Sequence, residues 1–275
     1  MASQITFIGA GNMARAIFGG LIESGYPADA ITATARHQQT LDTLAARYGI
    51  NVTTDNAGAV ADADVVILAV KPQLMRNVCQ SLGEALAIGR PLIISVAAGI
   101  TVDTLADWLD DPTLPIVRCM PNTPSLVGTG ASGLFAGQQV SAEQRELAES
   151  LMRAVGIVEW VEEETLLSAV TAIAGSAPAY FFYMIEALEK AGVARGLSPD
   201  SSRRLAIQTA LGAARMADQS EYDPETLKQQ VMSPKGTTER AIHCFEQAGL
   251  ERIVDDATRA CFDRAEELAR ELQQR

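Results

Sequence analysis

The sequence has little positive charge and no cluster of it. Its 275 residues include 22 Lys and Arg against 34 Asp and Glu, which gives a formal net charge of -12 at pH 7. Nucleic acids and anionic membrane surfaces are bound by concentrated positive charge, so we expect neither as a partner. Isolated basic side chains can still hold a small anion.

Cysteine and histidine are also scarce. The four cysteines form no CxxC pair, and a chain of this length needs no disulfide staples, so we expect reduced thiols in a cytoplasmic protein. The only histidines are His37 and His243, which argues against a His-based zinc site or a Ser-His-Asp triad, and we expect no metal. The sequence also shows no signal-peptide pattern and no apolar run of the roughly 18 residues that a membrane span needs.

The first 160 residues alternate between strand-like and helix-like patterns. Short runs rich in Ile and Val, typical of buried strands, alternate with segments whose apolar residues recur at helical spacing. Such alternation predicts an α/β domain of the Rossmann type, with a mostly parallel, doubly wound sheet. The predicted strands are residues 5–8, 31–35, 65–70, 92–96 and 116–120.

After Trp160 the strand-like runs stop and helical patterns take over. We therefore predict a Rossmann domain at residues 1–161 and an all-helical domain at 162–275. The acidic run at 159–164 is interpreted as a solvated connection with the acidic first turn of a helix. An Ala-rich helix and a long terminal helix at 250–272 offer more apolar surface than the second domain can bury alone, which predicts self-association through these helices.

Helix boundaries in the second half are marked by capping residues. Ser176 and Pro178 are expected to open a helix that Gly192 closes. Ser198 is expected to cap a helix that has Pro199 at its first position, where proline is favoured.

The segment Gly-Ala-Gly-Asn-Met-Ala follows the first predicted strand and opens a helix, which is the context of a dinucleotide-binding fingerprint. Gly9 permits the tight turn, Gly11 lets a pyrophosphate approach the backbone, and Ala14 still allows close packing of helix and strand. The amides that begin this helix, at Asn12 and Met13, then face the anion. The motif predicts NAD(P) binding.

The second strand distinguishes the two cofactors. NAD sites usually place Asp or Glu at its end, where the acid binds the ribose 2′-hydroxyl. This strand ends without an acid, and Arg36 lies where a 2′-phosphate would sit, with Thr34 and His37 as neighbouring donors. We expect NADP(H) as the cofactor, with NADH accepted less well. The alternative is that Arg36 is an ordinary exposed loop residue.

Two further strand ends belong to the same crevice, because ligands of such sheets bind outside the carboxyl ends of the strands. Small residues there let a flat nicotinamide ribose lie close to the backbone. Lys71 is a catalytic acid, a phosphate ligand or a positioning residue, and the sequence leaves these open. The residues expected at this edge are Ala69, Val70, Lys71 and Pro72 after one strand, and Ala97, Ala98 and Gly99 after the next.

An electrophile held against the nicotinamide needs polar and conformationally special residues, and three segments concentrate them. They lie at 118–124, at 174–180 and at 233–238. The third, Ser-Pro-Lys-Gly-Thr-Thr, stands just before a helix whose free amides and hydroxyls suit a carboxylate. Taken alone, it is equally a capped helix start.

Together the segments GAGNMA, AVKPQ, MPNTP, GSAPAY and SPKGTT resemble the pyrroline-5-carboxylate reductase family over the whole chain. The resemblance implies an N-terminal Rossmann domain that binds NADPH and a helical C-terminal domain that forms an intertwined dimer, with dimers often assembling further. It also implies reduction of the ring C=N of 1-pyrroline-5-carboxylate to L-proline, the last step of proline biosynthesis.

The resemblance assigns the substrate carboxylate and ring nitrogen to one loop: Ser233, Gly236, Thr237 and Thr238. Thr238 is the expected catalytic residue, because its hydroxyl can hydrogen-bond the ring nitrogen and order the substrate. Glu221 matches a position near the bound imino acid, and Asn56 one near the cofactor ribose. One departure is Lys235, where many members have Gly and some have Asn.

Two other functions fit parts of the pattern. β-Hydroxyacid dehydrogenases also join a Rossmann domain to a helical one, but they carry a catalytic Lys on the first long helix between the domains, and here no Lys occurs before Lys190. A non-catalytic NADP(H)-binding regulator would keep the fold. The Ser-Pro-Lys-Gly-Thr-Thr loop and Glu221 argue against it, since a sensor needs no site for a carboxylate and an imine.

Overall fold

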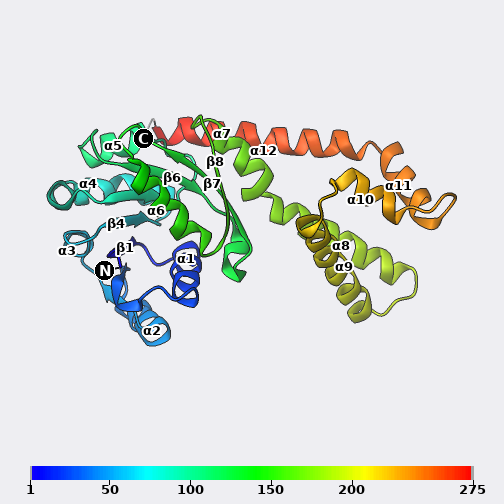
Figure 1. The fold of residues 1–275 in the computed structure, drawn as a ribbon, viewed down its shortest axis with the longest axis horizontal. Coiled ribbons are helices and arrows are strands. Elements are labelled where there is room, and N and C mark those ends of the chain that lie inside the picture. The colour runs from blue at the N-terminus through cyan, green and yellow to red at the C-terminus, as the bar shows by residue number, and fades with distance from the viewer. Residues whose placement is uncertain (1, 274–275) are drawn as a thin grey trace. The chain divides into compact units, whose positions relative to one another are not determined.

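A computed structural model describes residues 2–273 of the chain (Figure 1). Its contacts form two compact units. The first unit runs to Ser176 and takes in the chain again from Cys261, whereas the second is Ala177–Ala260. The last strand ends at Trp160, so the change from mixed to purely helical structure precedes the division between the units.

One sheet of eight strands organises the first unit, in the order β3-β2-β1-β4-β5-β6-β7-β8. All neighbours pair in parallel except β6 and β7, which confirms the predicted doubly wound sheet. The order reverses direction between β1 and β4, which places the glycine loop after β1 at the switch point. The strands are β1 (Ile5–Ile8), β2 (Ile31–Thr34), β3 (Asn51–Thr53), β4 (Val65–Leu68), β5 (Leu92–Ser95), β6 (Ile116–Met120), β7 (Gly130–Ala136) and β8 (Gly156–Trp160).

Helices cover both faces of this sheet, and alternate strand residues point into two cores. Phe7 and Ile67 pack with α1 (Asn12–Glu23), α2 (Gln38–Tyr48) and α6 (Ala142–Arg153). Their neighbours Ile8 and Leu68 pack with the helices of the opposite face. The helices of that face are α3 (Asn56–Val60), α4 (Pro72–Gly89) and α5 (Val102–Leu109), and short 3-10 turns lie at Ala28–Ala30 and Thr123–Val127.

The first unit ends in a helical segment. The helix α7 (Leu166–Val170) continues into a π-helical turn, Thr171–Gly175. The chain returns to this unit in the last part of α12 (Leu250–Gln273), whose Leu272 is buried in the second core. Both described ends of the chain therefore belong to the same unit.

The second unit contains α8 (Ala177–Ala194), α9 (Pro199–Gln219), α10 (Pro224–Val231), α11 (Thr237–Gln247) and the start of α12. Ser198 caps α9 as predicted, its hydroxyl accepting from the N–H of Ser201. The prediction that Gly192 ends α8 is wrong, because this residue lies inside the helix. A Cβ on Gly192 would stand 2.1 Å from the Ser202 hydroxyl, so the glycine permits close packing of α8 on α9.

Apolar side chains of the second unit are largely uncovered within one chain. Phe181 and Phe182 of α8 are 68% and 66% exposed, and the buried apolar residues of the unit are two alanines, Ala177 and Ala206. A soluble monomer rarely exposes such a surface, so the unit requires a partner to cover it.

By length and composition alone, the helical stretch Leu166–Ala194 is also long and apolar enough to cross a membrane, because an 18-residue window within it has a mean hydropathy of 1.3. The expectation that no such stretch exists is corrected here. Ser168 and Thr171 break the run of apolar residues without adding charge, which is why a count of consecutive apolar residues overlooked it.

Candidate functional site: a dinucleotide crevice and a helix-capping loop

The glycine loop after β1 has the geometry of a pyrophosphate cradle. Gly9 has φ +97°, a left-handed conformation that L side chains rarely adopt. A Cβ there would stand 2.8 Å from Val70 Cγ1 and 2.9 Å from the carbonyl oxygen of Ala69, so the ends of β1 and β4 meet at this point. A Cβ on Gly11 would have no atom within 4 Å, and this side of the loop is open to a ligand.

The N-terminus of α1 lacks any acceptor of its own for its first amides. Gly11 is the N-cap without a side-chain cap, and the first turn, which includes Asn12 and Met13, holds no acidic residue. Ala14 is fully buried and lets the helix sit close to the sheet. Unpaired amides and the positive end of the helix dipole suit the pyrophosphate of a dinucleotide, so these residues fit the expected cofactor.

Of the polar residues at the end of β2, one contacts the glycine loop and two face the solvent. Thr34 is 1% exposed, and its hydroxyl accepts a hydrogen bond of 3.2 Å from the N–H of Gly9. Arg36 and His37 are exposed beyond the strand. Asn56, partly buried, begins α3 just after β3, the strand that pairs with β2. Thr34 therefore braces the glycine loop, whereas Arg36 is exposed to solvent beyond the end of β2.

The ends of β4 and β5 form the rest of the crevice. Lys71 is exposed at the N-cap of α4, with Pro72 as the first helical residue. After β5, Ala97 is buried, Ala98 is exposed and Gly99 has φ +78°. A Cβ on Gly99 would stand 3.2 Å from Leu272 Cδ1, so the end of α12 lies against this turn.

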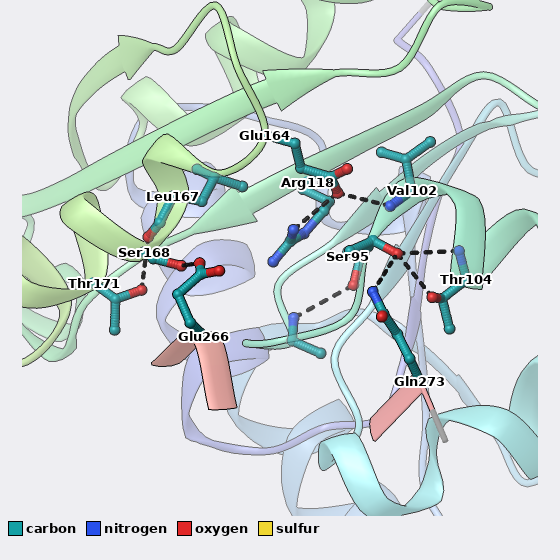
Figure 2. Close-up of polar contacts among 12 residues, drawn as sticks. Ser95, Val102, Thr104, Arg118, Glu164, Leu167, Ser168, Thr171, Glu266 and Gln273 are labelled. Atoms are coloured by element: carbon teal, nitrogen blue, oxygen red, sulfur yellow. Dashed lines mark hydrogen bonds and ion pairs between the residues drawn. The ribbon is translucent and has the colours of Figure 1, made fainter. Parts of the chain in front are cut away.

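A cavity of about 600 Å³ opens next to these strand ends, and all of its lining residues belong to the first unit. Its wall includes Pro72, Ala98 and Gly99, which the sequence assigns to the cofactor. Figure 2 shows the polar side chains around it, including the hydrogen bond from Ser168 of α7 to Glu266 of α12. Gln273, near the end of α12, donates to Thr101 Oγ1 at 3.5 Å.

An ion pair at this cavity was not foreseen. Arg118 of β6 donates to Glu164 at 2.8 Å, and the same Oε1 atom accepts from the N–H of Val102 at 2.7 Å (Figure 2). The side chains of Arg118 and Glu164 are 11% and 23% exposed, so the pair is largely removed from water. Glu164 belongs to the acidic run interpreted as solvated. An Arg inside an otherwise apolar strand was the available signal, since a buried charge requires a partner.

The loop at 233–238 has a defined backbone that fits its predicted role. Lys235 has φ +61°, and its N–H donates to Glu239 Oε2 at 2.7 Å. A Cβ on Gly236 would stand 2.3 Å from Ser233 Oγ, so only glycine fits this turn. Gly236 is the N-cap of α11 and provides no side-chain cap.

Helix α11 begins with Thr237 and Thr238, the two predicted site hydroxyls of this loop. Thr238 is partly buried, whereas Ser233 and Thr237 are exposed. The turn therefore leaves free amides and hydroxyls together at one helix N-terminus, which is an arrangement suited to a carboxylate.

Glu221 lies in the connection between α9 and α10, in the same unit as the loop at 233–238. The carboxylate of Asp223, two residues on, caps α10 by accepting from the N–H of Thr226 at 2.7 Å. This hydrogen bond lowers the pKa of Asp223 below its usual value. Glu221 itself is exposed on a short, capped connection.

Known families match both parts of the chain. Residues 164–268 match a family described as pyrroline-5-carboxylate reductase dimerisation. Residues 4–99 match a family described as NADP oxidoreductase, coenzyme F420-dependent.

Relatives match over nearly the whole length. A pyrroline-5-carboxylate reductase of Pseudomonas aeruginosa is 50% identical over 98% of this chain and 98% of its own length. One of Vibrio alginolyticus is 47% identical over 96% of this chain and 97% of its own length. The solved structure of a Coxiella burnetii pyrroline-5-carboxylate reductase is 45% identical with a TM-score of 0.94, covering 98% and 99% of the two chains. A Plasmodium falciparum pyrroline carboxylate reductase, solved with NADP bound, is 25% identical with a TM-score of 0.85, covering 97% and 98%.

Proposed function

The chain belongs to the pyrroline-5-carboxylate reductase family, and from this membership we propose which of its residues carry out the reaction. The reaction is the NADPH-dependent reduction of the ring C=N of 1-pyrroline-5-carboxylate to L-proline, the last step of proline biosynthesis. The enzyme is an oxidoreductase that acts on a C=N bond, with NADP(H) as its cofactor.

In the proposed arrangement, residues at the ends of several strands each bind a different part of the dinucleotide. The loop Gly9–Gly11 and the first amides of α1, at Asn12 and Met13, receive the pyrophosphate. Arg36 pairs with the 2′-phosphate, which an isolated exposed guanidinium suits, and Asn56 lies by a ribose. The nicotinamide half lies along the ends of β4 and β5, at Ala69, Val70, Lys71, Pro72, Ala97, Ala98 and Gly99. The open space beside Gly11 supports this arrangement.

The substrate binds at the N-terminus of α11. The amides of Thr237 and Thr238 and the hydroxyl of Ser233 hold its carboxylate, and Glu221 lies near the bound imino acid. The single observation that carries this assignment is the uncapped helix start at Gly236, whose turn has room for no side chain. Helix dipole and unpaired amides favour an anion at this point.

Hydride addition to a C=N bond is easiest when the nitrogen is protonated, because the iminium carbon is the better acceptor. NADPH, when bound, supplies the hydride. The hydroxyl of Thr238 hydrogen-bonds the ring nitrogen, directly or through a water, and fixes the face of the ring that accepts it. The residues therefore act by orientation more than by a strong base.

The observations argue against both alternatives, a β-hydroxyacid dehydrogenase and a non-catalytic NADP(H)-binding regulator. The only Lys of α8, Lys190, is exposed and pairs with Glu186 on the same helix. More distant structures, such as a prephenate dehydrogenase at 17% identity and a TM-score of 0.53, share the fold alone. The whole-length relatives are reductases, and a regulator has no use for the loop at 233–238.

The protein associates with itself, as the matched dimerisation family and the uncovered apolar helices indicate. The finer proposal is a cytoplasmic homodimer formed by the C-terminal helices, with a cyclic imino acid as substrate and neither nucleic acid nor membrane as partner. A second copy covers α8, so the apolar stretch of this helix needs no membrane. The four free cysteines are consistent with a reducing compartment.

The assignment of the loop is tested by steady-state kinetics of Gly236→Ala. The new methyl group collides with Ser233, so KM for 1-pyrroline-5-carboxylate should rise at least about tenfold while the Kd of NADPH stays unchanged. Gly19→Ala in α1 is the matched control, since its nearest atom would be an ordinary contact at 3.5 Å. An unchanged KM in Gly236→Ala would refute the loop as the substrate site.

A further inference from the structure

The cavity beside β5 holds an arginine with more donors than partners. The side chain of Arg118 is only 11% exposed. Within residues 2–273, the only hydrogen bond of this side chain joins one terminal nitrogen to Glu164. A guanidinium has five N–H donors. Because Arg118 lines the cavity, the remaining donors can be satisfied by a ligand there.

The charges around the cavity balance. Three arginines and three glutamates line it, namely Arg118, Arg264, Arg270, Glu164, Glu266 and Glu271. A carboxylate or phosphate placed here would face those three glutamates without an excess of positive charge to compensate. The cavity therefore suits a neutral group with a strong acceptor oxygen better than an anion.

We propose that Arg118 binds the carboxamide oxygen of the cofactor's nicotinamide, a role distinct from the binding of phosphates or substrate. The proposal rests on the placement of the nicotinamide half along β4 and β5, because Pro72, Ala98 and Gly99 line the same cavity. A hydrogen bond to this oxygen fixes the rotation of the nicotinamide ring about its glycosidic bond, and so the face that donates the hydride.

Glu164 is a positioning residue in this arrangement. Its carboxylate holds Arg118 from one side and the N–H of Val102, the first residue of α5, from the other. This carboxylate thereby holds the guanidinium of β6 against the start of α5 (Figure 2), at a position where Arg118 lines the cavity.

The test compares two ligands that differ by the nicotinamide. Calorimetric titration of Arg118→Met should show NADPH binding weakened about tenfold or more, as for the loss of a hydrogen bond from a charged donor. Binding of 2′-phospho-ADP-ribose, which lacks the ring, should stay within about twofold of the unaltered protein. Arg90→Met is the matched control, because Arg90 also pairs with one carboxylate, Asp111 at 3.2 Å, but is exposed.

Three outcomes would overturn the proposal. Equal weakening of both ligands would mean a general defect of the crevice. Unchanged NADPH binding would mean that Arg118 does not touch the ring, and a raised KM for the imino acid alone would assign the arginine to the substrate. Failure of the unaltered protein to bind NADPH at all would instead refute the proposed placement of the cofactor.

A second measurement needs no variant, in case Arg118→Met does not fold. In the unaltered protein, thionicotinamide NADPH should bind about tenfold more weakly than NADPH, because sulfur is a poor hydrogen-bond acceptor. The acetylpyridine analogue keeps the carbonyl oxygen and should bind as NADPH does. Equal affinity for the sulfur and oxygen forms would contradict a hydrogen bond to this oxygen.

Discussion

The backbone N–H of Lys235 donates to the carboxylate of Glu239 at 2.7 Å and closes the turn that precedes α11. Lys235 holds φ +61°, in the left-handed region where glycine is favoured. This conformation explains why the resembling family often has Gly or Asn at this position. The ammonium group has no part in the turn itself, so the backbone alone decides what the position tolerates.

Two substitutions of Lys235 therefore separate the effect of its backbone conformation from the effect of its side-chain charge. Lys235→Gly should keep kcat and KM near those of the unaltered enzyme, and change stability by less than about 1 kcal/mol, because relief of strain offsets the added freedom of the unfolded chain. Lys235→Val loses the same charge but puts a β-branched residue at positive φ, and KM for the imino acid should rise. Equal KM values for the two variants would show that the turn geometry is irrelevant to binding.

Arg36→Ala tests the cofactor preference. Losing the contact between the Arg36 guanidinium and the 2′-phosphate should raise KM for NADPH roughly ten- to hundredfold. This corresponds to about 1.5–3 kcal/mol, as for a charged hydrogen bond. KM for NADH should not change, because NADH has no 2′-phosphate. Gln39→Ala, an exposed residue in the first turn of α2 with no proposed part in the site, serves as a control for disturbance of this surface. An NADPH/NADH preference that does not move would make Arg36 an ordinary loop residue.

Local chemistry made much of this structure predictable. Gly9 has a positive φ, which glycine adopts readily. The start of α9 depends only on residues close in sequence, the Ser198 cap and Pro199 after it. Both features could therefore be predicted from the sequence. Gly192 and Glu164 were misjudged because their partners, Ser202 and Arg118, come close only in the folded chain.

Three strands also escaped prediction, for reasons of composition. The edge strand β3 is the polar triplet Asn-Val-Thr, and β7 is interrupted by glycines and serine. The strand β8 carries Glu159 and ends at the acidic run. Strand assignment from apolar runs finds strands that are buried on both faces. It overlooks the two edge strands, β3 and β8, and also β7, whose glycines and serine interrupt the apolar run.

Gly192→Ala should loosen the packing of α8 on α9. The added methyl group would meet Ser202 Oγ at 2.1 Å, and overpacking of this kind typically costs about 1–3 kcal/mol. Thermal unfolding at a fixed protein concentration should show a lower Tm. The double variant Gly192→Ala/Ser202→Ala should recover part of the loss, because it removes the colliding hydroxyl. A Tm equal to that of the unaltered protein would mean that the two helices are not in close contact here.

The buried thiols should be unreactive in the native protein. Burial raises the pKa of both Cys79 and Cys119 to about 12, so each stays protonated at pH 8 and is not a nucleophile. Titration with a thiol reagent should modify at most Cys244 and Cys261 before denaturation and all four cysteines after it. Cys244→Ser should remove one native equivalent, because this thiol is exposed. Native modification of Cys119, located by mass spectrometry, would contradict its burial.

The central claim is that the hydroxyl of Thr238 orders an imine for reduction by NADPH, and kcat/KM for NADPH oxidation tests it most directly. The unaltered enzyme should oxidise NADPH only when 1-pyrroline-5-carboxylate is present. Thr238→Ala should lose about tenfold or more in kcat/KM for that substrate, the loss of about 1.4 kcal/mol of transition-state stabilisation. Thr43→Ala, which removes a hydroxyl bonded only to its own helix, should lose nothing. Full efficiency in Thr238→Ala, or no substrate-dependent oxidation in the unaltered enzyme, would contradict the account.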